Sequence, residues 1–345
     1  MLALRLLEWK NGPALEEVAD PEPGPGEVLI RIGGAGACHS DLHLMYEFEA
    51  GVVPWGPPFT LGHENAGWVE ALGPGVAHLE IGEAVAVYGP WGCGRCHRCV
   101  QGMENYCMHQ AEIPVMGGGL GADGGMAPLM LVPNARHLVS LGDLDPVAAA
   151  PLTDAGLTPY HAIKRSLGLL VPGSTAVVIG AGGLGHMAVQ ILSTLTPATI
   201  VAVDRSEDAL RLARAVGAEH GVVSRPASAA EIRDITGGKG ADVVIDLVGS
   251  DETLQLGAAV ARTLGHLTLV GLAGGSLAVS FFGLPYELSV ASTYWGSIPE
   301  LIEVIALARS GKIGAHVERF SLTQAADAYE RMRAGTLHGR AVIVP

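Results

Sequence analysis

The sequence predicts an α/β protein with two domains, one a doubly wound parallel sheet and the other a mostly β domain. Its 345 residues exceed what one hydrophobic core usually organises. From about residue 173 the chain alternates apolar strand, glycine turn and helix-length segment, which is typical of a parallel sheet covered by helices. The first 150 residues instead carry short β-branched runs broken by signals such as PEPGPG, which indicates an irregular β domain.

The expected elements follow in order. The first region gives strands at 27–32 and 83–88. The second region gives strands at 175–180, 199–204, 241–249 and 266–271, with helices at 183–195, 206–217 and 251–264 between them. After about residue 289 we expect one amphipathic helix at 299–309 and a closing strand at 341–345, and this tail resembles the first region.

Composition excludes several classes of partner. Hydrophobic residues make up 49% of the chain, charged residues 16%, and the formal net charge is −14. An acidic chain without Lys/Arg-rich runs repels phosphate and anionic lipid, so we expect no nucleic acid and no membrane partner. The absence of a long apolar stretch and of a secretory signal, together with an odd count of five cysteines, favours a cytoplasmic protein whose thiols bind metal or act in catalysis.

A glycine turn opens the second region. Gly180, Gly182 and Gly185 form GxGxxG between a strand and a helix, with Gly183 and Leu184 inside the turn. Glycine lets the backbone turn tightly, lets a pyrophosphate approach, and packs the helix on the strand with its N-terminus facing the phosphates. The alternative is a glycine turn that serves packing alone. The strand–turn–helix context favours a dinucleotide site.

The next strand ends in a carboxylate, Asp204, 19 residues beyond Gly185. At that place it can accept hydrogen bonds from both hydroxyls of an adenosine ribose, and it would repel a 2′-phosphate. NAD is therefore favoured over NADP. Arg205 follows directly and would soften this discrimination.

Four of the five cysteines lie in one short stretch. They are Cys93, Cys96, Cys99 and Cys107, spaced CxxCxxCx7C. Two-residue gaps let thiolates converge on one ion, and four ligands leave no open position, so the spacing predicts a structural zinc. An iron–sulfur cluster is the alternative for the same ligands. Disulfides are disfavoured in a cytosolic chain.

The fifth cysteine, Cys38, lies 25 residues before His63. A lone cysteine and a lone histidine are each more often packing residues than ligands. Beside a nucleotide-binding fold, however, they supply two of the three protein ligands that a catalytic zinc needs. The third has to come from elsewhere in the chain.

These motifs together resemble the zinc-dependent medium-chain alcohol dehydrogenases. The resemblance rests on GACHSD, LGHE, the cysteine stretch, VVIGAGGLGHMAVQ and KGADVVIDLVG, and it covers essentially the whole chain. It implies a GroES-like catalytic domain from residues 1–153 and 291–345, with a structural zinc lobe at 91–108. A Rossmann NAD-binding domain at 154–290 is then inserted between its two parts.

The resemblance also implies the third zinc ligand, Asp154, as in the bacterial secondary-alcohol branch. The thiolate of Cys38 and the carboxylate of Asp154 then balance Zn²⁺, with His63 neutral. A helix cap is the alternative role for Asp154. Coordination to zinc lowers the pKa of a hydroxyl, so we expect hydride transfer from an alcohol to NAD.

A proton path is implied next. Ser40 resembles the family's first relay hydroxyl, and His43 matches its terminal base, although His43 could instead form pocket wall. Asp41 and Glu64 resemble carboxylates that orient the ligands, and Glu64 is also a transient zinc ligand in this reading. The alternative for both carboxylates is an ordinary capping or surface role.

The remaining implied sites concern cofactor and substrate. His39 and Arg340 are expected at the pyrophosphate, and Thr158 beside the nicotinamide. The expected substrate pocket is apolar and aromatic, and the alternative for its aromatic pair is a core position. Its residues are Trp55, Leu120, Tyr294 and Trp295.

We therefore expect a reversible NAD-dependent dehydrogenase of secondary, and also primary, alcohols that carries two zinc ions per chain. The alternatives are a polyol or threonine dehydrogenase of the same fold, or a catalytically silent nucleotide-binding relative. The resemblance further implies a homotetramer.

Overall fold

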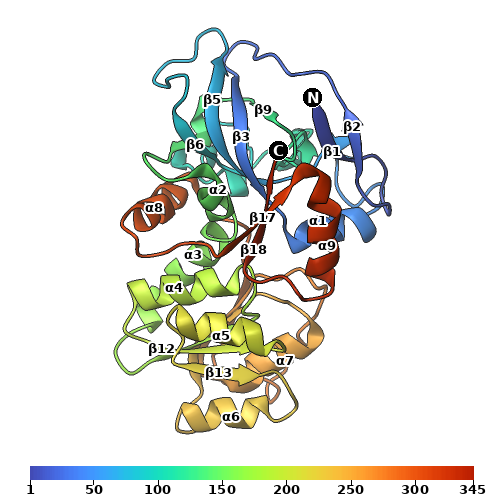
Figure 1. Cartoon of the computed structure of the whole chain (residues 1–345). Helices are drawn as coiled ribbons and strands as arrows, with labels where there is room; N and C mark the ends of the chain where they lie inside the picture. The colour runs from blue at the N-terminus through green and yellow to red at the C-terminus, as the bar shows by residue number, and fades with distance from the viewer. The chain divides into compact units, whose positions relative to one another are not determined.

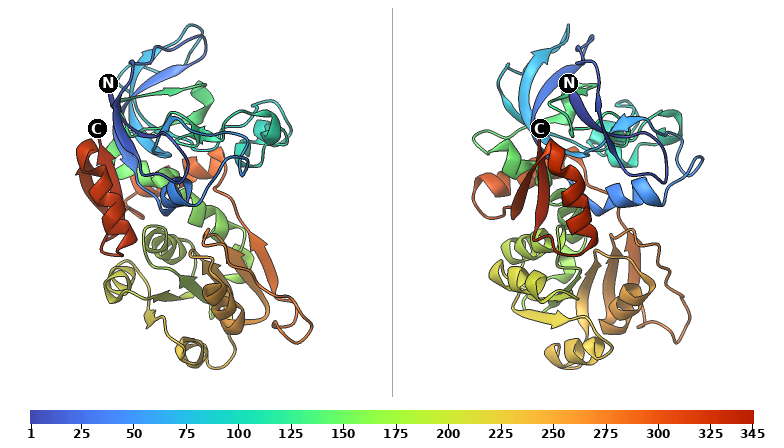
Figure 2. Two further views of the ribbon diagram at one scale, coloured as in Figure 1. Left: turned by 90° about the vertical axis from the view of Figure 1, so that its right-hand side faces the viewer. Right: turned by 45° about the vertical axis from the view of Figure 1, so that its right-hand side comes forward.

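The computed structural model describes all 345 residues, which divide into two compact units. Unit 1 combines Met1–Leu157 with Gly296–Pro345, and unit 2 is Thr158–Trp295. Both chain termini lie in unit 1 (Figure 1, Figure 2). The joins expected from the sequence, 153/154 and 290/291, lie a few residues earlier. None of the helices has the length and apolar character needed to span a bilayer.

Unit 1 is built mainly from antiparallel β-structure. A seven-stranded sheet has the order β10-β6-β5-β3-β18-β17, with β9 also paired to β3, and a three-stranded sheet has the order β2-β1-β4. The strands are β1 (Leu2–Leu6), β2 (Ala14–Glu17), β3 (Val28–Gly36), β4 (Phe59–Thr60), β5 (Glu64–Leu72), β6 (Ala84–Val87), β7 (Gly117–Gly118), β8 (Gly121–Ala122), β9 (Leu129–Val132), β10 (Leu138–Ser140), β17 (Val317–Ser321) and β18 (Arg340–Val344).

The end of the chain completes this sheet. β18 pairs with β3, so Ile343 lies opposite Ala35, and β17 then pairs in parallel with β18. All but the last of the five residues of β18 are buried, as expected for a strand in the interior of a sheet. The expected likeness between tail and first region is therefore confirmed.

Unit 1 also contains α-helices. They are α1 (His39–Tyr46), α2 (Pro146–Ala149), α8 (Ile298–Arg309) and α9 (Ala325–Arg333), while α3 (Leu157–Lys164) begins at the join. α8 starts with a capping box, because Ser297 accepts from the Glu300 amide and the Glu300 carboxylate accepts from the Ser297 amide. The expected helix at 299–309 is thus confirmed, beginning one residue earlier.

Unit 2 contains a six-stranded parallel sheet of order β13-β12-β11-β14-β15-β16. Numbered within the unit this is 3-2-1-4-5-6, the doubly wound dinucleotide-binding order, so the predicted fold class is confirmed. Its strands are β11 (Thr175–Ile179), β12 (Thr199–Asp204), β13 (His220–Val223), β14 (Ala241–Asp246), β15 (Ala261–Leu269) and β16 (Ser289–Ser292), and its helices are α4 (Gly185–Leu195), α5 (Glu207–Ala215), α6 (Ser228–Ile235) and α7 (Asp251–Val260). Figure 2 shows the yellow and orange helices around this sheet.

Local sequence explains most of these elements. β11 is fully buried and rich in β-branched residues, as a central parallel strand should be. Ser206 caps α5 by accepting from the Ala209 amide, and two carboxylates in the first turn favour the helix dipole.

The structure corrects one expected helix end and adds a helix that was not expected. The helix expected over 251–264 ends at Val260, because Ala261 already pairs with Ala241 and Arg262 binds the Asp242 carboxylate at 2.6 Å. α9 was not expected from the sequence, because its many charged residues obscure the buried face formed by Ala325, Ala328, Tyr329 and Met332.

Candidate active site

The glycine turn of unit 2 lies between β11 and α4, where each of the three motif glycines meets a different demand. Gly180 has φ +90°, a left-handed conformation that strains other residues. A Cβ on Gly185 would come 2.0 Å from the Gly180 carbonyl oxygen, so only glycine lets the helix approach the strand. A Cβ on Gly182 would meet nothing within 4 Å, which leaves this face of the turn open for a ligand.

The turn also fixes the carboxylate at the end of β12. Asp204, at the end of β12, accepts from the Ala181 amide through Oδ2 at 2.7 Å and from the Ser206 amide through Oδ1 at 2.8 Å. A carboxylate oxygen has a second lone pair, so both oxygens keep capacity to accept from a diol. Arg205 is exposed beside it, and Gly183 and Leu184 are half-buried within the turn.

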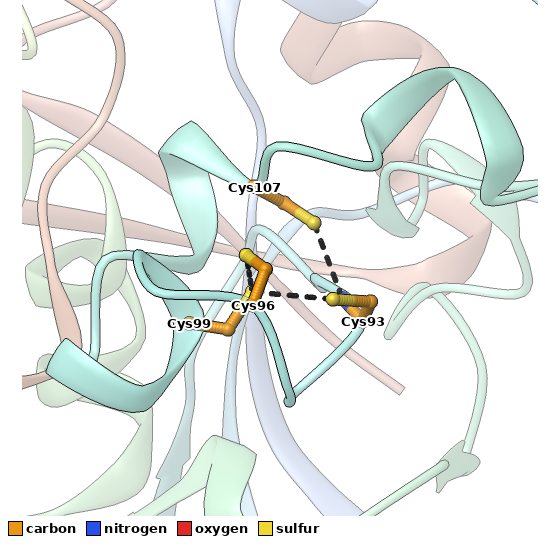
Figure 3. Close-up of side chains that lie close together, drawn as sticks. All are labelled: Cys93, Cys96, Cys99 and Cys107. Carbon is orange, nitrogen blue, oxygen red and sulfur yellow. Dashed lines mark hydrogen bonds between the residues drawn. The ribbon is translucent and has the colours of Figure 1, made fainter.

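The four clustered cysteines converge in unit 1 (Figure 3). The Sγ atom of Cys99 lies 3.4 Å from that of Cys96 and 3.9 Å from that of Cys93. Zn–S bonds of about 2.3 Å in a tetrahedron place sulfur atoms about 3.8 Å apart, so the spacing fits zinc. The amides of Cys93 and His109 donate to Cys107 Sγ at 3.4 Å each, as expected for a thiolate.

A second cluster gathers three expected ligands from different elements of unit 1. Cys38 precedes α1, His63 lies just before β5, and Asp154 follows the short helix Ala150–Thr153. Asp154 Oδ2 lies 3.8 Å from both Cys38 Sγ and His63 Nε2. These separations are close to the roughly 3.3–3.8 Å that sulfur, nitrogen and oxygen ligands keep around a tetrahedral zinc.

Glu64 is the fourth member of this cluster. Its carboxylate, with the other three ligand atoms, belongs to a group whose members all lie within 4.8 Å of one another. Gly36 makes room for it, since a Cβ there would come 1.9 Å from Glu64 Oε2. Burial first, and Asp154 in addition, raise the pKa of Glu64 to about 7, although Arg340 acts in the opposite direction.

The buried guanidinium of Arg340 pairs with this carboxylate. Arg340 Nε donates to Glu64 Oε2 at 2.9 Å, its Nη2 contacts Glu64 Oε1, and Nη2 lies 3.7 Å from Asp154 Oδ2. The side chain is 4% exposed. Arg340 therefore lies beside the ligand cluster, a position that the sequence analysis did not anticipate; its expected contact with a pyrophosphate stays a prediction.

Asp41 orients His63 through Nδ1, the ring nitrogen that does not face the other ligand atoms. Asp41 Oδ1 lies 3.0 Å from His63 Nδ1, while Oδ2 accepts from the Cys38 amide at 2.9 Å and from the Tyr329 hydroxyl at 2.8 Å. Burial alone would raise the pKa of Asp41, but His63 outweighs it and the pKa is lowered. An ionised Asp41 holds the proton on Nδ1 and leaves Nε2 free to bind metal.

Tyr329 was missed by sequence reasoning. It lies on α9, 288 residues from Asp41, and its ring is buried. No motif marks it, because its role depends only on the way β17, α9 and β18 return to the first part of the chain.

The expected relay residues lie on α1. Ser40 Oγ is 3.2 Å from His63 Nε2, on the side that faces the ligand atoms. His43 Nδ1 instead lies 2.7 Å from Glu47 Oε2, one helical turn away, and no hydrogen bond joins it to Ser40. His39 is the first residue of α1 and is exposed. Both the relay and pocket-wall roles of His43 therefore stay predictions.

The expected pocket residues are divided between the units. In unit 1, Trp55 is buried and packs its ring edge-on against Phe59 at 5.7 Å, and Leu120 is also buried. In unit 2, the rings of Tyr294 and Trp295 meet edge-on at 6.0 Å, and Thr158 is buried at the start of the unit. Whether these residues line one substrate pocket stays a prediction.

Comparison with known proteins gives consistent matches along the chain. Residues 24–143 match the family model "Alcohol dehydrogenase GroES-like domain", and residues 183–310 match "Zinc-binding dehydrogenase". The chain is 37% identical to an NAD-dependent alcohol dehydrogenase of Sulfurisphaera tokodaii, with all of both chains covered. It is also 37% identical to a D-arabinose 1-dehydrogenase (NADP(+)) of Saccharolobus solfataricus, over 99% of this chain and 97% of the relative.

Comparison with solved structures supports the same family. The alcohol dehydrogenase of the archaeon Aeropyrum pernix superposes with a TM-score of 0.93 at 36% identity, covering all of both chains. The resemblance drawn from the motifs, the pairing of a GroES-like with a Rossmann domain, and the expectation of zinc and NAD as cofactors are confirmed.

Proposed function

The chain belongs to the zinc-dependent medium-chain alcohol dehydrogenases, and we propose that it transfers hydride reversibly between NAD and a secondary alcohol, with primary alcohols as further substrates. One observation carries the proposal: the ligand atoms of Cys38, His63 and Asp154 converge in one buried cluster, whose fourth member, Glu64, is paired with Arg340. Three protein ligands leave a position for substrate, whereas a structural zinc takes four.

The chemistry divides between the cofactors and the chain. Zinc, when bound, supplies a Lewis acid that lowers the pKa of a coordinated hydroxyl, and NAD supplies the hydride acceptor. Cys38 and Asp154 supply the two negative charges that balance the metal. Asp41 keeps the Nδ1 proton on His63, so that Nε2 remains a ligand. Ser40, 3.2 Å from that nitrogen, is placed to accept the proton that leaves the substrate.

Cofactor binding is proposed for the turn and strand ends of unit 2. The open face at Gly182 would admit the pyrophosphate, and Asp204 would accept from the ribose hydroxyls. We assign residues 154–290 to NAD binding and residues 1–153 with 291–345 to catalysis, with Asp154, at the join, serving the zinc site. Arg340 and His39 at the pyrophosphate, Thr158 at the nicotinamide and the pocket residues named above complete the proposal.

A polyol or sugar dehydrogenase is the second candidate. The observation that favours it is the 37% identity to a D-arabinose 1-dehydrogenase that uses NADP(+). Asp204 disfavours that cofactor, because its carboxylate would repel a 2′-phosphate. The complete ligand cluster, in turn, disfavours a catalytically silent relative.

Assembly into a homotetramer is also proposed. A tetramer with dihedral symmetry needs two different self-complementary surfaces. Exposed apolar side chains in both units are candidates for such surfaces. In unit 2, Phe281 and Phe282 are 74% and 87% exposed near the edge strand β16, and in the cysteine lobe Val100 and Met108 are 69% and 68% exposed. Sedimentation velocity would give the mass of the assembly.

We also propose that the protein is cytoplasmic, because thiolate metal ligands stay reduced in that compartment.

The function is tested by mixing zinc-loaded protein with NAD or NADP and a panel of substrates, and following reduced cofactor by absorbance. The panel contains a simple secondary alcohol, its primary isomer, a polyol, threonine and D-arabinose. We expect NAD reduction with the secondary alcohol at the highest kcat/KM. Turnover of only the sugar or polyol would establish the second candidate, and no turnover by fully zinc-loaded protein would contradict both.

A further inference from the structure

A buried carboxylate lies inside the cysteine lobe without belonging to its metal ligands. Glu104 begins the short helix Glu104–Tyr106, between the third and fourth cysteines, and its side chain is 1% exposed. Burying a carboxylate is costly unless it is paired and hydrogen-bonded. The contacts of Glu104 therefore indicate what its charge is used for.

Those contacts converge on the backbone of one residue, Gly92. Glu104 Oε2 accepts from the Gly92 amide at 2.6 Å, and Oε1 accepts from Arg136 Nε at 2.7 Å. Arg136 Nη2 in turn donates to the Gly92 carbonyl oxygen at 3.0 Å. The ion pair thus binds both the N–H and the C=O of Gly92, the residue directly before the first zinc ligand, Cys93.

The ion pair is also held by neighbouring residues of unit 1. Arg136 and His137 belong to the short helix Ala135–His137, and His137 Nε2 lies 3.0 Å from Glu104 Oε2. The imidazole of His137 is 1% exposed and stacks on Trp91, with ring centroids 5.6 Å apart. Arg136 also packs on the other side of Cys93, because a Cβ on Gly94 would come 2.9 Å from its Cζ.

Cys93 is the ligand that most needs such support. It is half-buried, while Cys96, Cys99 and Cys107 are buried. It also lies between two glycines, of which Gly94 has φ +70°. Glycine has the largest backbone entropy of any residue in an open loop. Without a restraint, Cys93, between Gly92 and Gly94, would therefore dissociate easily from the metal.

We propose that Glu104 and Arg136 are positioning residues. Together they form a clamp that holds the backbone of Gly92 and thereby keeps Cys93 in place as a zinc ligand. The clamp slows local opening of the lobe, which is the route by which a closed four-cysteine site loses its metal. It acts on the lobe itself, and its action is separate from any contribution to the global stability of unit 1.

The test measures how fast each cysteine of the zinc-loaded full chain reacts with N-ethylmaleimide, with the modified residues identified by peptide mass spectrometry. Cys38, outside the lobe, is the internal reference for general unfolding. The variants are Glu104→Gln, Glu104→Ala, Arg136→Met and the Glu104→Gln/Arg136→Met pair. Glu112→Gln is the matched control, because Glu112 is an exposed carboxylate just after the lobe whose side chain pairs with His109.

We expect Cys93 to react about 10- to 100-fold faster in Glu104→Gln and in Arg136→Met, as for other residues that orient metal ligands. The double variant should react no more than about twofold faster than the faster single variant, because both residues act through the backbone of Gly92. Zinc should be released to a chromogenic chelator at a correspondingly higher rate. Glu112→Gln should match the wild type.

Three results would overturn the proposal. One is an unchanged Cys93 rate in Glu104→Gln and Glu104→Ala. Another is an equal acceleration at Cys38 and Cys93, which indicates general destabilisation. The third is a double variant whose acceleration is the product of the two single effects. If Glu104→Ala does not fold, Glu104→Gln decides, since its amide keeps the volume and can still accept from Gly92.

Discussion

Replacing Asp41 by asparagine should weaken the catalytic zinc site without touching any zinc ligand. The asparagine oxygen can still accept from the Cys38 amide and the Tyr329 hydroxyl, which now share Oδ2 at 2.9 and 2.8 Å. Its NH₂ group then takes the place of Oδ1, 3.0 Å from His63 Nδ1. Two donors would face each other unless His63 moved its proton to Nε2, the atom that binds metal.

The expected magnitude follows from the lost interaction. A hydrogen bond to a charged group contributes about 1.5–3 kcal/mol, which corresponds to about 10- to 150-fold in an equilibrium constant. We therefore expect Asp41→Asn to bind the catalytic zinc about 10- to 100-fold more weakly, while the four-cysteine zinc is retained. Tyr329→Phe leaves the carboxylate in place and should weaken binding less.

Zinc content after equilibration in a series of metal buffers measures this affinity. Asp123→Asn is the control, since Asp123 binds Arg5 and the Thr60 amide and is not among the residues of the ligand cluster. A catalytic zinc affinity within threefold of wild type in Asp41→Asn would refute the reasoning that Asp41 sets the tautomer of His63.

Three further outcomes are expected. Cys99→Ser should lower the melting temperature and promote aggregation in a thermal scan, because zinc binding there is coupled to local folding. Asp204→Ala should cut kcat/KM for NAD about tenfold or more and leave NADP much less affected; an unchanged ratio would remove Asp204 from the ribose site. Tyr88→Phe should cost about 1–3 kcal/mol, seen as a lower melting temperature, since its buried hydroxyl donates to the Gly296 carbonyl at 2.6 Å. An unshifted melting curve would contradict this.

How far the sequence predicts this molecule depends on how local each feature is. The glycine turn and the CxxCxxCx7C lobe lie within about 15 residues of chain, and spacing alone predicts their geometry. The order of the parallel strands follows from alternating elements under right-handed connection rules. These parts of the fold and of the site could be read in advance.

The missed features join distant parts of the chain. Arg340 and Glu64 are 276 residues apart, Tyr329 and Asp41 are 288 apart, and Arg136 and Glu104 are 32 apart. The contacts between these residues depend on which strands pair in the sheet of unit 1, and no short sequence motif predicts that pairing. Asp154 was expected only through the resemblance, because a single carboxylate before a helix is equally typical of a cap.

The central claim is that Asp154 completes a catalytic zinc site, and one experiment on Asp154→Asn tests it directly. The substitution keeps the volume and removes a charge that balances Zn²⁺. Zinc content and turnover with NAD and a secondary alcohol would be measured on the same sample. We expect about two zinc ions per wild-type chain and about one in the variant, with turnover lost and the melting temperature hardly moved. Near-normal turnover with both zinc ions retained would contradict the claim, and Glu64 would then be the first residue to examine as the third ligand.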